Sequence, residues 1–512
     1  MSITQRTLIP LTILTASLLY YLSYASYGFS EEDWGGIIVA ADRFLKGDVF
    51  YRDFNIVYTP GLYLYTALAF KISNISLSTA AAAWSVLRAL NCVLIYVLGS
   101  RFFSWKIALA LPLVLWLAPG PLHKSFLVSL ELISILSLVS IIQGQNRGTY
   151  FFAGLTAGIL LLFRIDLFAV FILLSAVSII IKQFQYKMDL NISSWLMNCI
   201  LFLSAFSILI IPFIYYLFYH DALADAITML RNYSSSVQIK WVQLPSVLNI
   251  ASWTIWGYIN YLVILIPAGV YFTFLVQLPS ALRKTRDSTL ACMGIITLYG
   301  LLLMPQILRA PWTGRLYQVL PPMLIIAFYL MLNSREMLKC RPFLTMLPII
   351  SSTALALIII ASCTTSDIYM NNSIFIRLTN TTRLIAPGVN TYTTPSIAGE
   401  FNRVREIIES ETAPGEPIFT VHHLPMYYFA TGRVNATRHY FLESYAASIE
   451  SQKEIIEDLQ RKQVKLVIVS TNYLYADIES APLVMEYLTE HFSEQETVGN
   501  KIILIRKTGL SQ

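Results

Sequence analysis

Long apolar segments recur through the first 362 residues of this chain, and they constrain its fold more than any other feature. Several contain the roughly 20 apolar residues that a helix needs to cross a bilayer. Of the 512 residues, 56% are hydrophobic and 13% are charged. A soluble globular protein has about 25% charged residues. The sequence therefore predicts an α-helical integral membrane protein with many spans.

The charges between the apolar segments indicate the topology. The first span, residues 8–27, has no small-x-small cleavage pattern and is expected to stay uncleaved. Residues 60–75 are short for a span, contain Lys71 and begin at a Pro-Gly turn, so we expect a helix lying in the membrane interface. If this segment crossed instead, the next cations would lie outside, against the positive-inside bias. This topology has about eleven transmembrane helices in total, including the first span. It places the N-terminus inside and a first extracytoplasmic loop at residues 28–79.

The composition changes near residue 363, where long apolar runs give way to polar and charged residues. We expect a transmembrane domain over residues 1–362 and a soluble extracytoplasmic domain over residues 363–512. In the latter, alternating strands and helices predict a small α/β layer. The expected strands are 417–423, 464–471 and 501–507, and the expected helices are 453–462 and 482–492.

Three consecutive carboxylates, Glu31, Glu32 and Asp33, follow the first apolar span. Carboxylates at a bilayer surface cost desolvation energy unless water or a cation compensates them. A carboxylate placed there can take a proton from a hydroxyl acceptor while the lipid tail of a donor stays in the bilayer. Glu32 and Asp33 are the candidate catalytic bases. On spacing alone, a solvated helix flank is the alternative.

Asp53, in the segment Tyr-Arg-Asp-Phe, is a candidate second carboxylate of the same cleft. The alternative is an ion pair with Arg52 or another residue of the loop. Asp42 shares an amphipathic helix with Arg43 and Lys46, and we interpret it as part of a solvated face.

A lipid-phosphate donor requires cations near the outer leaflet. Arg315 is the strongest candidate, because it lies beside Tyr317 at the start of a span and arginine can hold phosphate with two hydrogen bonds. Arg164 is a second candidate, with a structural pair to Asp166 as its alternative. Lys124 is a third, with a snorkelling lysine as its alternative. The other outer-loop candidates are His123, Arg231, Lys240 and Arg309.

No metal site or nucleic-acid-binding arm is predicted. The five cysteines are isolated and are interpreted as buried thiols. His422 and His423 are adjacent in an expected strand, so their side chains point to opposite faces and are unsuited to share one ion. We interpret them as structural or surface histidines.

Several segments resemble those of one superfamily. They are A-D-R-F-L-K-G at 41–47, V-F-Y-R-D-F at 49–54, Y-T-P-G at 58–61 and R-L-Y-x-x-L-P at 315–321. Together with the carboxylates after the first span and the C-terminal α/β domain, they resemble the GT-C polytopic glycosyltransferases. Within that superfamily the similarity is to the branch with bacterial lipid A aminoarabinose transferases and protein O-mannosyltransferases. It covers nearly the whole chain, although each motif alone is loose.

The resemblance implies transfer of a sugar from a polyprenyl-phosphate carrier on the outer face of the inner (plasma) membrane, with inversion at the anomeric carbon. The acidic pair of the family falls on Glu32 and Asp33, in reversed order, and we favour Asp33 as the base. The acid that the family places before the Pro-rich turn would fall at Tyr58 and is absent, so Asp53 is the candidate substitute. A divalent cation is therefore left open and is not required by the sequence. By position, Arg315 and Tyr317 match the segment that meets the donor phosphate.

The residues support that chemistry, because a phosphate leaves as an anion and one base with several cations is sufficient. The acceptor can be a lipid, a glycan or a protein. A transporter or flippase of lipid-linked glycans is an alternative, and it would need charges deep within the spans. Only Arg88 and Glu131 suggest such charges, and both lie near expected helix ends. A polymerase or ligase of lipid-linked glycans is a further alternative.

Overall fold

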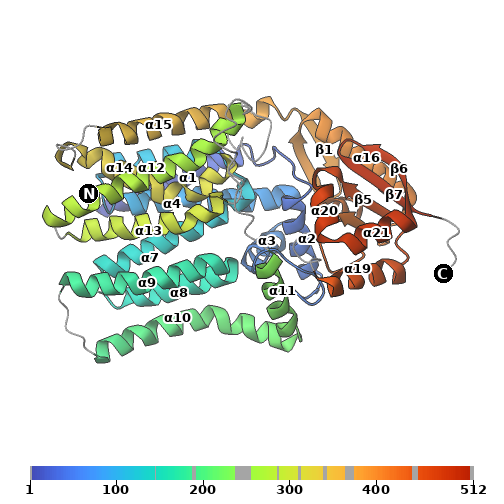
Figure 1. The fold of residues 1–512 in the computed structure, drawn as a ribbon, viewed down its shortest axis with the longest axis horizontal. Coiled ribbons are helices and arrows are strands. Elements are labelled where there is room, and N and C mark those ends of the chain that lie inside the picture. The colour runs from blue at the N-terminus through green and yellow to red at the C-terminus, as the bar shows by residue number, and fades with distance from the viewer. Residues whose placement is uncertain are drawn as a thin grey trace. The chain divides into compact units, whose positions relative to one another are not determined.

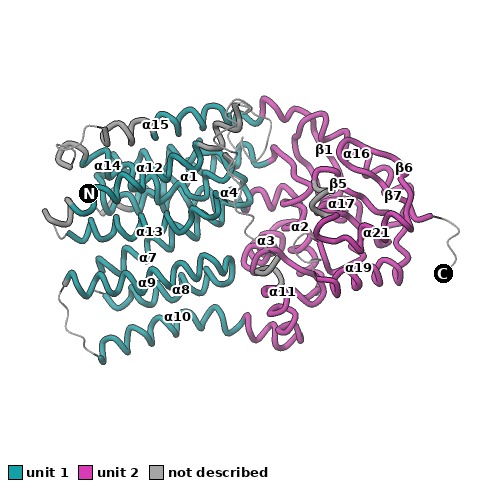
Figure 2. Tube along the Cα trace, viewed as in Figure 1, with its two compact units in different colours: residues 1–25, 84–212, 240–376 teal, residues 26–83, 213–239, 377–512 magenta. Residues whose placement is uncertain are grey.

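The structure is a computed structural model that describes residues 3–144, 146–186, 192–236, 255–284, 287–308, 313–337, 343–363, 374–440 and 448–507. The chain divides into two compact units, each built from several stretches of sequence (Figure 2). Unit 1 contains residues 1–25, 84–212 and 240–376. Unit 2 contains residues 26–83, 213–239 and 377–512.

Unit 1 is helical, as the apolar segments predict, and each of the eleven expected spans contains helix. The expected span at residues 107–118 is divided into α5 and α6 at Leu109. The helices are α1 (Ile3–Leu22), α4 (Leu77–Gly99), α5 (Trp105–Ala108), α6 (Ala110–Leu117), α7 (Ser125–Gln143), α8 (Gly148–Phe163), α9 (Ile165–Tyr186), α10 (Ile192–Tyr219), α12 (Ile255–Lys284), α13 (Ser288–Leu308), α14 (Leu316–Met337) and α15 (Phe343–Ser362). Helices α4 and α10 continue into unit 2.

Seven helical segments among the described residues are long and apolar enough to cross a membrane. Burial separates the central helices of unit 1 from the peripheral ones. In α7, 89% of the most apolar window is buried, whereas in α10 the share is 17% (Figure 1). The seven segments are Leu77–Gly99, Leu122–Gln143, Ile165–Gln185, Ile192–Tyr219, Leu262–Pro279, Ser288–Leu308 and Leu316–Asn333. The membrane protein class is thus supported, and the count of eleven spans stays a prediction.

The part of unit 2 that follows the first span contains two helices that pack together, α2 (Asp33–Leu45) and α3 (Gly61–Ile72). At 12 residues, α3 is about 18 Å long, too short for the roughly 30 Å hydrocarbon core of a bilayer. A short helix is what the sequence predicts for this segment, and its place in the membrane interface stays a prediction. A third helix of unit 2, α11 (Leu223–Ser236), follows α10.

The C-terminal residues of unit 2 form a five-stranded sheet in the order β4-β3-β5-β7-β6. The bounds are β3 (Pro417–Val421), β4 (Val434–Asn435), β5 (Leu466–Ser470), β6 (Phe492–Val498) and β7 (Lys501–Arg506). Strand β3 pairs in parallel with β4 and β5, whereas β7 pairs antiparallel with β5 and β6. Every residue of β5 is buried, as its unbroken apolar sequence predicts for a covered strand.

Helices α16 (Pro395–Glu411), α17 (Met426–Thr431), α19 (Ile449–Arg461), α20 (Leu474–Ser480) and α21 (Pro482–His491) accompany this sheet. Ile455 and Leu459 of α19 and Leu488 of α21 bury their side chains in one core with the strands. All five strands and helices that the sequence predicts here are present, so the α/β fold of this part is confirmed. Its extracytoplasmic location stays a prediction.

The first loop and the C-terminal residues belong to the same compact unit. A hairpin, β1 (Thr382–Ala386) with β2 (Val389–Thr393), binds the start of the loop through its second strand. The Gly28 amide donates to the Tyr392 carbonyl at 2.7 Å, and the Tyr392 amide donates to the Ser26 carbonyl at 2.8 Å. Farther along, the Asn55 amide donates to the Arg438 carbonyl at 2.9 Å. The predicted division into residues 1–362 and 363–512 separates the first loop from the C-terminal residues, whereas the structure groups the two in one unit.

Candidate functional site

The three opening carboxylates occupy different positions around the start of α2. Glu31 lies before the helix, Glu32 is its N-cap residue, and Asp33 is its first residue. All three side chains are half-buried. The N-terminus of a helix favours negative charge, because its first amide groups point toward it. A negative charge is therefore favourably placed at Asp33, and a general base must carry such a charge.

Glu31 has a structural role that sequence analysis did not separate from that of its neighbours. Its Oε1 accepts a hydrogen bond from the Tyr427 hydroxyl at 2.8 Å, and its Oε2 lies 3.0 Å from Nζ of Lys501. The Lys501 side chain is only 5% exposed, and that of Glu31 is 13% exposed. This buried ion pair joins the start of α2 to the first residue of β7. No local pattern in the sequence indicates a partner 470 positions away.

Two glycines allow the C-terminal part of unit 2 to approach α2 closely. A Cβ atom on Gly35 would lie 2.4 Å from the Met426 backbone nitrogen at the start of α17. A Cβ atom on Gly36 would lie 2.7 Å from Nε2 of His423. A side chain at position 35 would collide with the backbone of α17, so Gly35 is required for this packing, whereas a side chain at position 36 would force the His423 ring to move. In the sequence this pair is visible, but its reason is not.

His423 faces the first turns of α2 in its neutral form. Its Nδ1 lies 3.1 Å from the carbonyl oxygen of Tyr440, and a carbonyl can only accept, so Nδ1 carries the proton. Its Nε2, directed at Gly36, is then the unprotonated nitrogen. Burial lowers the pKa of His423 to about 3, while the charge of Asp33 acts in the opposite direction. His423 is therefore a neutral side chain beside the candidate base, which is a structural role as the sequence predicts.

This lowered pKa predicts an acid sensitivity of unit 2. Below pH 6.5 the unfolded chain protonates His423 while the folded protein does not, so stability is complete above pH 6.5 and is lost as the pH falls toward 3. We expect His423→Gln to reduce the loss of stability between pH 6.5 and pH 4 by up to about 3 kcal/mol. Thermal unfolding of both proteins across this range measures the effect. Equal pH dependence in the two proteins would contradict it.

Asp53 forms the ion pair with Arg52 that the sequence left as its alternative. Nε and Nη2 of Arg52 lie 2.9 Å from Oδ1 and Oδ2 of Asp53, and the Val49 amide donates to Oδ2 at 2.7 Å. The hydrogen bonds from Arg52 lower the pKa of Asp53, with the Val49 amide and Arg43 adding to the effect. Asp53 is thus ionised and held in place.

The four main candidate phosphate-binding residues lie in unit 1, whereas the further candidate Arg231 lies in α11 of unit 2. Arg164 pairs with Asp166 through Nε at 2.7 Å and through a second contact at Nη2, the structural alternative considered for it. Arg315 ends the short helix η3 (Thr313–Arg315) at the start of α14, and its Nη1 donates to the Gln306 carbonyl at 2.7 Å. Lys124 is half-buried at the end of η1 (Leu122–Lys124), directly before α7. Of the other candidates, Lys240 and Arg309 lie outside the described residues.

Tyr317 is fully buried, and a buried arginine covers its ring. The Arg88 guanidinium carbon lies 3.8 Å from the centre of the Tyr317 ring, and Asn91 donates to the Tyr317 hydroxyl at 3.2 Å. Arg88 also donates to the carbonyls of Gly120 and Ala118, both at 2.9 Å. Arg88 therefore faces the interior of unit 1 and joins α4 and the segment before η1 to α14. The sequence analysis placed Arg88 near a helix end, whereas it lies, fully buried, in the middle of α4 (Leu77–Gly99).

No metal centre emerges from the described part of the chain. In those residues, no three His, Cys, Asp or Glu side chains gather in a way that could hold an ion. The position where the sequence resemblance leads us to expect a further acid is Tyr58.

Comparison with known proteins gives a fold relationship but no sequence relationship. No protein-family model matches the chain, and no curated protein sequence matches it. The crystal structure of ArnT from Cupriavidus metallidurans bound to undecaprenyl phosphate is similar with a TM-score of 0.52 and 13% identity, covering 100% of both chains. ArnT from the same organism in the apo state is similar with a TM-score of 0.51 and 12% identity, again covering 100% of both chains. The chain therefore has a fold similar to that of ArnT along its whole length, which agrees with the predicted resemblance.

Proposed function

We propose that this protein is an inverting glycosyltransferase of the GT-C type, which transfers a sugar from a polyprenyl-phosphate donor on the outer face of the inner (plasma) membrane. One observation carries the proposal: carboxylates open α2 directly after the first apolar helix, in a chain that shares the fold of ArnT along its whole length. The undecaprenyl phosphate bound to that ArnT supports a lipid-phosphate donor for this chain. The acceptor is a hydroxyl of a lipid, a glycan or a protein, and residues 363–512 lie on the outer face.

Asp33 is the proposed base, with Glu32 as the second candidate. The carboxylate takes the proton of the acceptor hydroxyl while that oxygen forms a bond to the anomeric carbon of the sugar. The bond from the anomeric carbon to the phosphate oxygen breaks, and the polyprenyl phosphate leaves with the electron pair. A single displacement inverts the anomeric configuration. Because the leaving group is already an anion, no general acid is needed.

The donor phosphate is assigned to Arg315, Lys124 and Arg164, and the fourth candidate, Tyr317, is a positioning residue. Arg315 has the strongest support, because η3 places it directly before α14 and a guanidinium can bind two phosphate oxygens. Tyr317 is buried under Arg88, so it would act by fixing the start of α14. Arg164 is held by Asp166, which fixes the direction of its guanidinium. Asp53 is the proposed second carboxylate of the first loop.

Deletion of the gene tests the proposed activity without knowledge of the sugar. We expect one polyprenyl-phosphate-linked sugar to accumulate, and the same sugar to disappear from one envelope component, because donor synthesis continues after its consumption stops. Mass spectrometry of extracted lipids and envelope fractions measures both changes, and the wild-type gene should reverse them. Unchanged donor pools and unchanged envelope sugars would contradict the proposal.

A further inference from the structure

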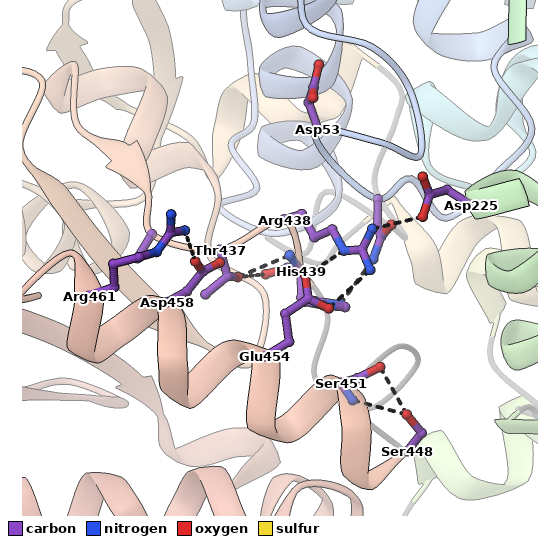
Figure 3. Close-up of polar contacts among 12 residues, drawn as sticks. Asp53, Asp225, Thr437, Arg438, His439, Ser448, Ser451, Glu454, Asp458 and Arg461 are labelled. Atoms are coloured by element: carbon purple, nitrogen blue, oxygen red, sulfur yellow. Dashed lines mark hydrogen bonds and ion pairs between the residues drawn. The ribbon is translucent and has the colours of Figure 1, made fainter. Parts of the chain in front are cut away.

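A polar cavity of about 760 Å³ lies within unit 2, lined by residues of the first loop, of the segment 435–438 and of α19. Asp53, the second carboxylate considered above, contributes to its lining, as does Arg43 at the far end of α2. Figure 3 shows part of this lining, with α19 carrying Glu454, Asp458 and Arg461. Asp53 thus lies beside Arg43, at the opposite end of α2 from Asp33, and not in one cleft with Asp33 as the sequence predicts. Apart from Asp53, the activity proposed above gives the residues of this cavity no role.

A network of hydrogen bonds and ion pairs holds one wall of the cavity in place (Figure 3). Arg438 donates to Asp225 of α11 and to Glu454 of α19, both at 3.1 Å. Nε2 of His439 lies 3.3 Å from Oε2 of Glu454. Nδ1 of His439 lies 3.0 Å from the side-chain nitrogen Nδ2 of Asn55. The bond from His439, with those from Arg438, lowers the pKa of Glu454 to about 2. Three segments far apart in sequence are thereby fixed around the cavity before any ligand binds.

The charges of the lining nearly cancel, which indicates the chemistry of a ligand. Five cationic side chains and four carboxylates line the cavity. Several are paired with one another, such as Arg52 with Asp53 and Arg461 with Asp458. A site for a phosphate would present an excess of cations, and a site for an apolar peptide would be mostly apolar. This lining instead mixes donors and acceptors.

Saccharides match such a surface, because each hydroxyl both donates and accepts a hydrogen bond. Alternating guanidinium donors and carboxylate acceptors can bind neighbouring hydroxyls of one sugar ring. The amides of Asn435 and Gln460 and the hydroxyl of Thr437 add groups that do both. The wall formed by Arg438, His439 and Glu454 is ordered before a ligand binds, which lowers the entropy cost of binding.

The distance along α2 relates the cavity to the candidate base. Asp33 begins α2, and Arg43 of the cavity lining lies ten residues later in the same helix. At 1.5 Å per residue, the two are about 15 Å apart along the helix axis. A ligand in the cavity is therefore too far from Asp33 to present its own hydroxyl there. It suits a remote part of an extended acceptor, whose binding energy orients the reacting end.

We propose that this cavity binds an uncharged saccharide portion of the acceptor, several sugar units from the hydroxyl that reacts. The inference rests on the proposed glycosyl transfer and narrows its acceptor to a saccharide-bearing molecule, either a free glycan chain or the head group of a glycolipid. The cavity then selects the acceptor, and the first loop supplies the base.

Binding to the full-length protein in detergent, measured by saturation-transfer NMR with uncharged hexose and N-acetylhexosamine oligosaccharides, tests the inference. Glu457 and Gln460 line the cavity and are exposed on α19. The double variant Glu457→Ala with Gln460→Ala removes their hydrogen bonds and should weaken binding by about tenfold or more. The matched control, Glu450→Ala with Lys453→Ala, changes two exposed residues of the same helix outside the lining and should bind within about twofold of the wild type.

If a soluble oligosaccharide binds, the acceptor is a free glycan chain. If only a detergent-solubilised glycolipid binds, the acceptor is the head group of a glycolipid. Both outcomes support the inference when the lining variant weakens them. The inference is overturned if no saccharide binds, if the lining variant binds like the wild type, or if only inorganic phosphate or peptides bind in the cavity. The two proposals can fail separately. If the wild-type protein transfers no sugar but binds saccharides, and the lining variant loses that binding, the proposed function is contradicted and the saccharide site is still supported.

Discussion

Replacement of Asp33 by Asn should lower kcat for sugar transfer by about 10²- to 10⁴-fold, the usual contribution of a general base. The amide is similar in size to the carboxylate but cannot accept the acceptor proton. KM for the donor should change little, because the donor phosphate is assigned to residues of unit 1. Transfer from a polyprenyl-phosphate sugar by purified protein in liposomes measures both quantities.

Three variants make this result specific. Asp42→Asn is the matched control on the same helix and should retain activity. Asp42 pairs with Lys46 at 2.7 Å, and its side chain is 13% exposed, so it is more buried than the solvated face expected from the sequence. Glu32→Gln shows which of the two acids is the base. Arg315→Ala should raise KM for the donor with a smaller effect on kcat. Normal transfer by both Asp33→Asn and Glu32→Gln, at wild-type expression, would remove the assignment of the base to α2.

Replacement of Lys501 by Met should destabilise the protein by about 3–5 kcal/mol, because it leaves the buried Glu31 carboxylate without its cation. Oε2 of Glu400 also lies 3.7 Å from Nζ of Lys501, so the same change removes a second, weaker ion pair. The double variant Lys501→Met with Glu31→Gln should recover part of the loss, since no uncompensated charge stays buried. Unfolding followed by intrinsic fluorescence measures the three proteins.

Lys465→Met is the matched control for that experiment. Lys465 pairs with Glu416 at 2.6 Å, a shorter distance than that of the buried pair, but its side chain is 59% exposed. An exposed pair contributes about 0–1 kcal/mol, since water screens it. If Lys501→Met and Lys465→Met lower the free energy of unfolding equally, burial does not determine how much the Glu31–Lys501 pair stabilises the protein.

The ion pairs show how far sequence reasoning extends into the candidate site. Arg52–Asp53 and Arg164–Asp166 join residues one and two positions apart, so the sequence could name both as alternatives to functional roles. Glu31–Lys501 and the Arg88–Tyr317 contact join residues far apart in the chain. Their partners depend on how helices and strands pack, which no local pattern specifies.

By itself, the sequence determined the long apolar helices, the short helix α3 and, within residues 417–507, three strands and two helices. It did not predict β4, β6, α17 or α20. Each of the elements that it did predict follows from the length, apolar period and composition of one segment. The reason is that a helix or strand buries one face of that segment and hydrogen-bonds its backbone with a fixed period. Only the tertiary structure decided that Glu31 is a structural acid while Glu32 and Asp33 open α2. It also decided why Gly35 and Gly36 follow them, since both glycines serve contacts with residues about 390 positions away. Neighbours in space at such separations are set by packing of the whole unit, which a sequence read segment by segment does not contain.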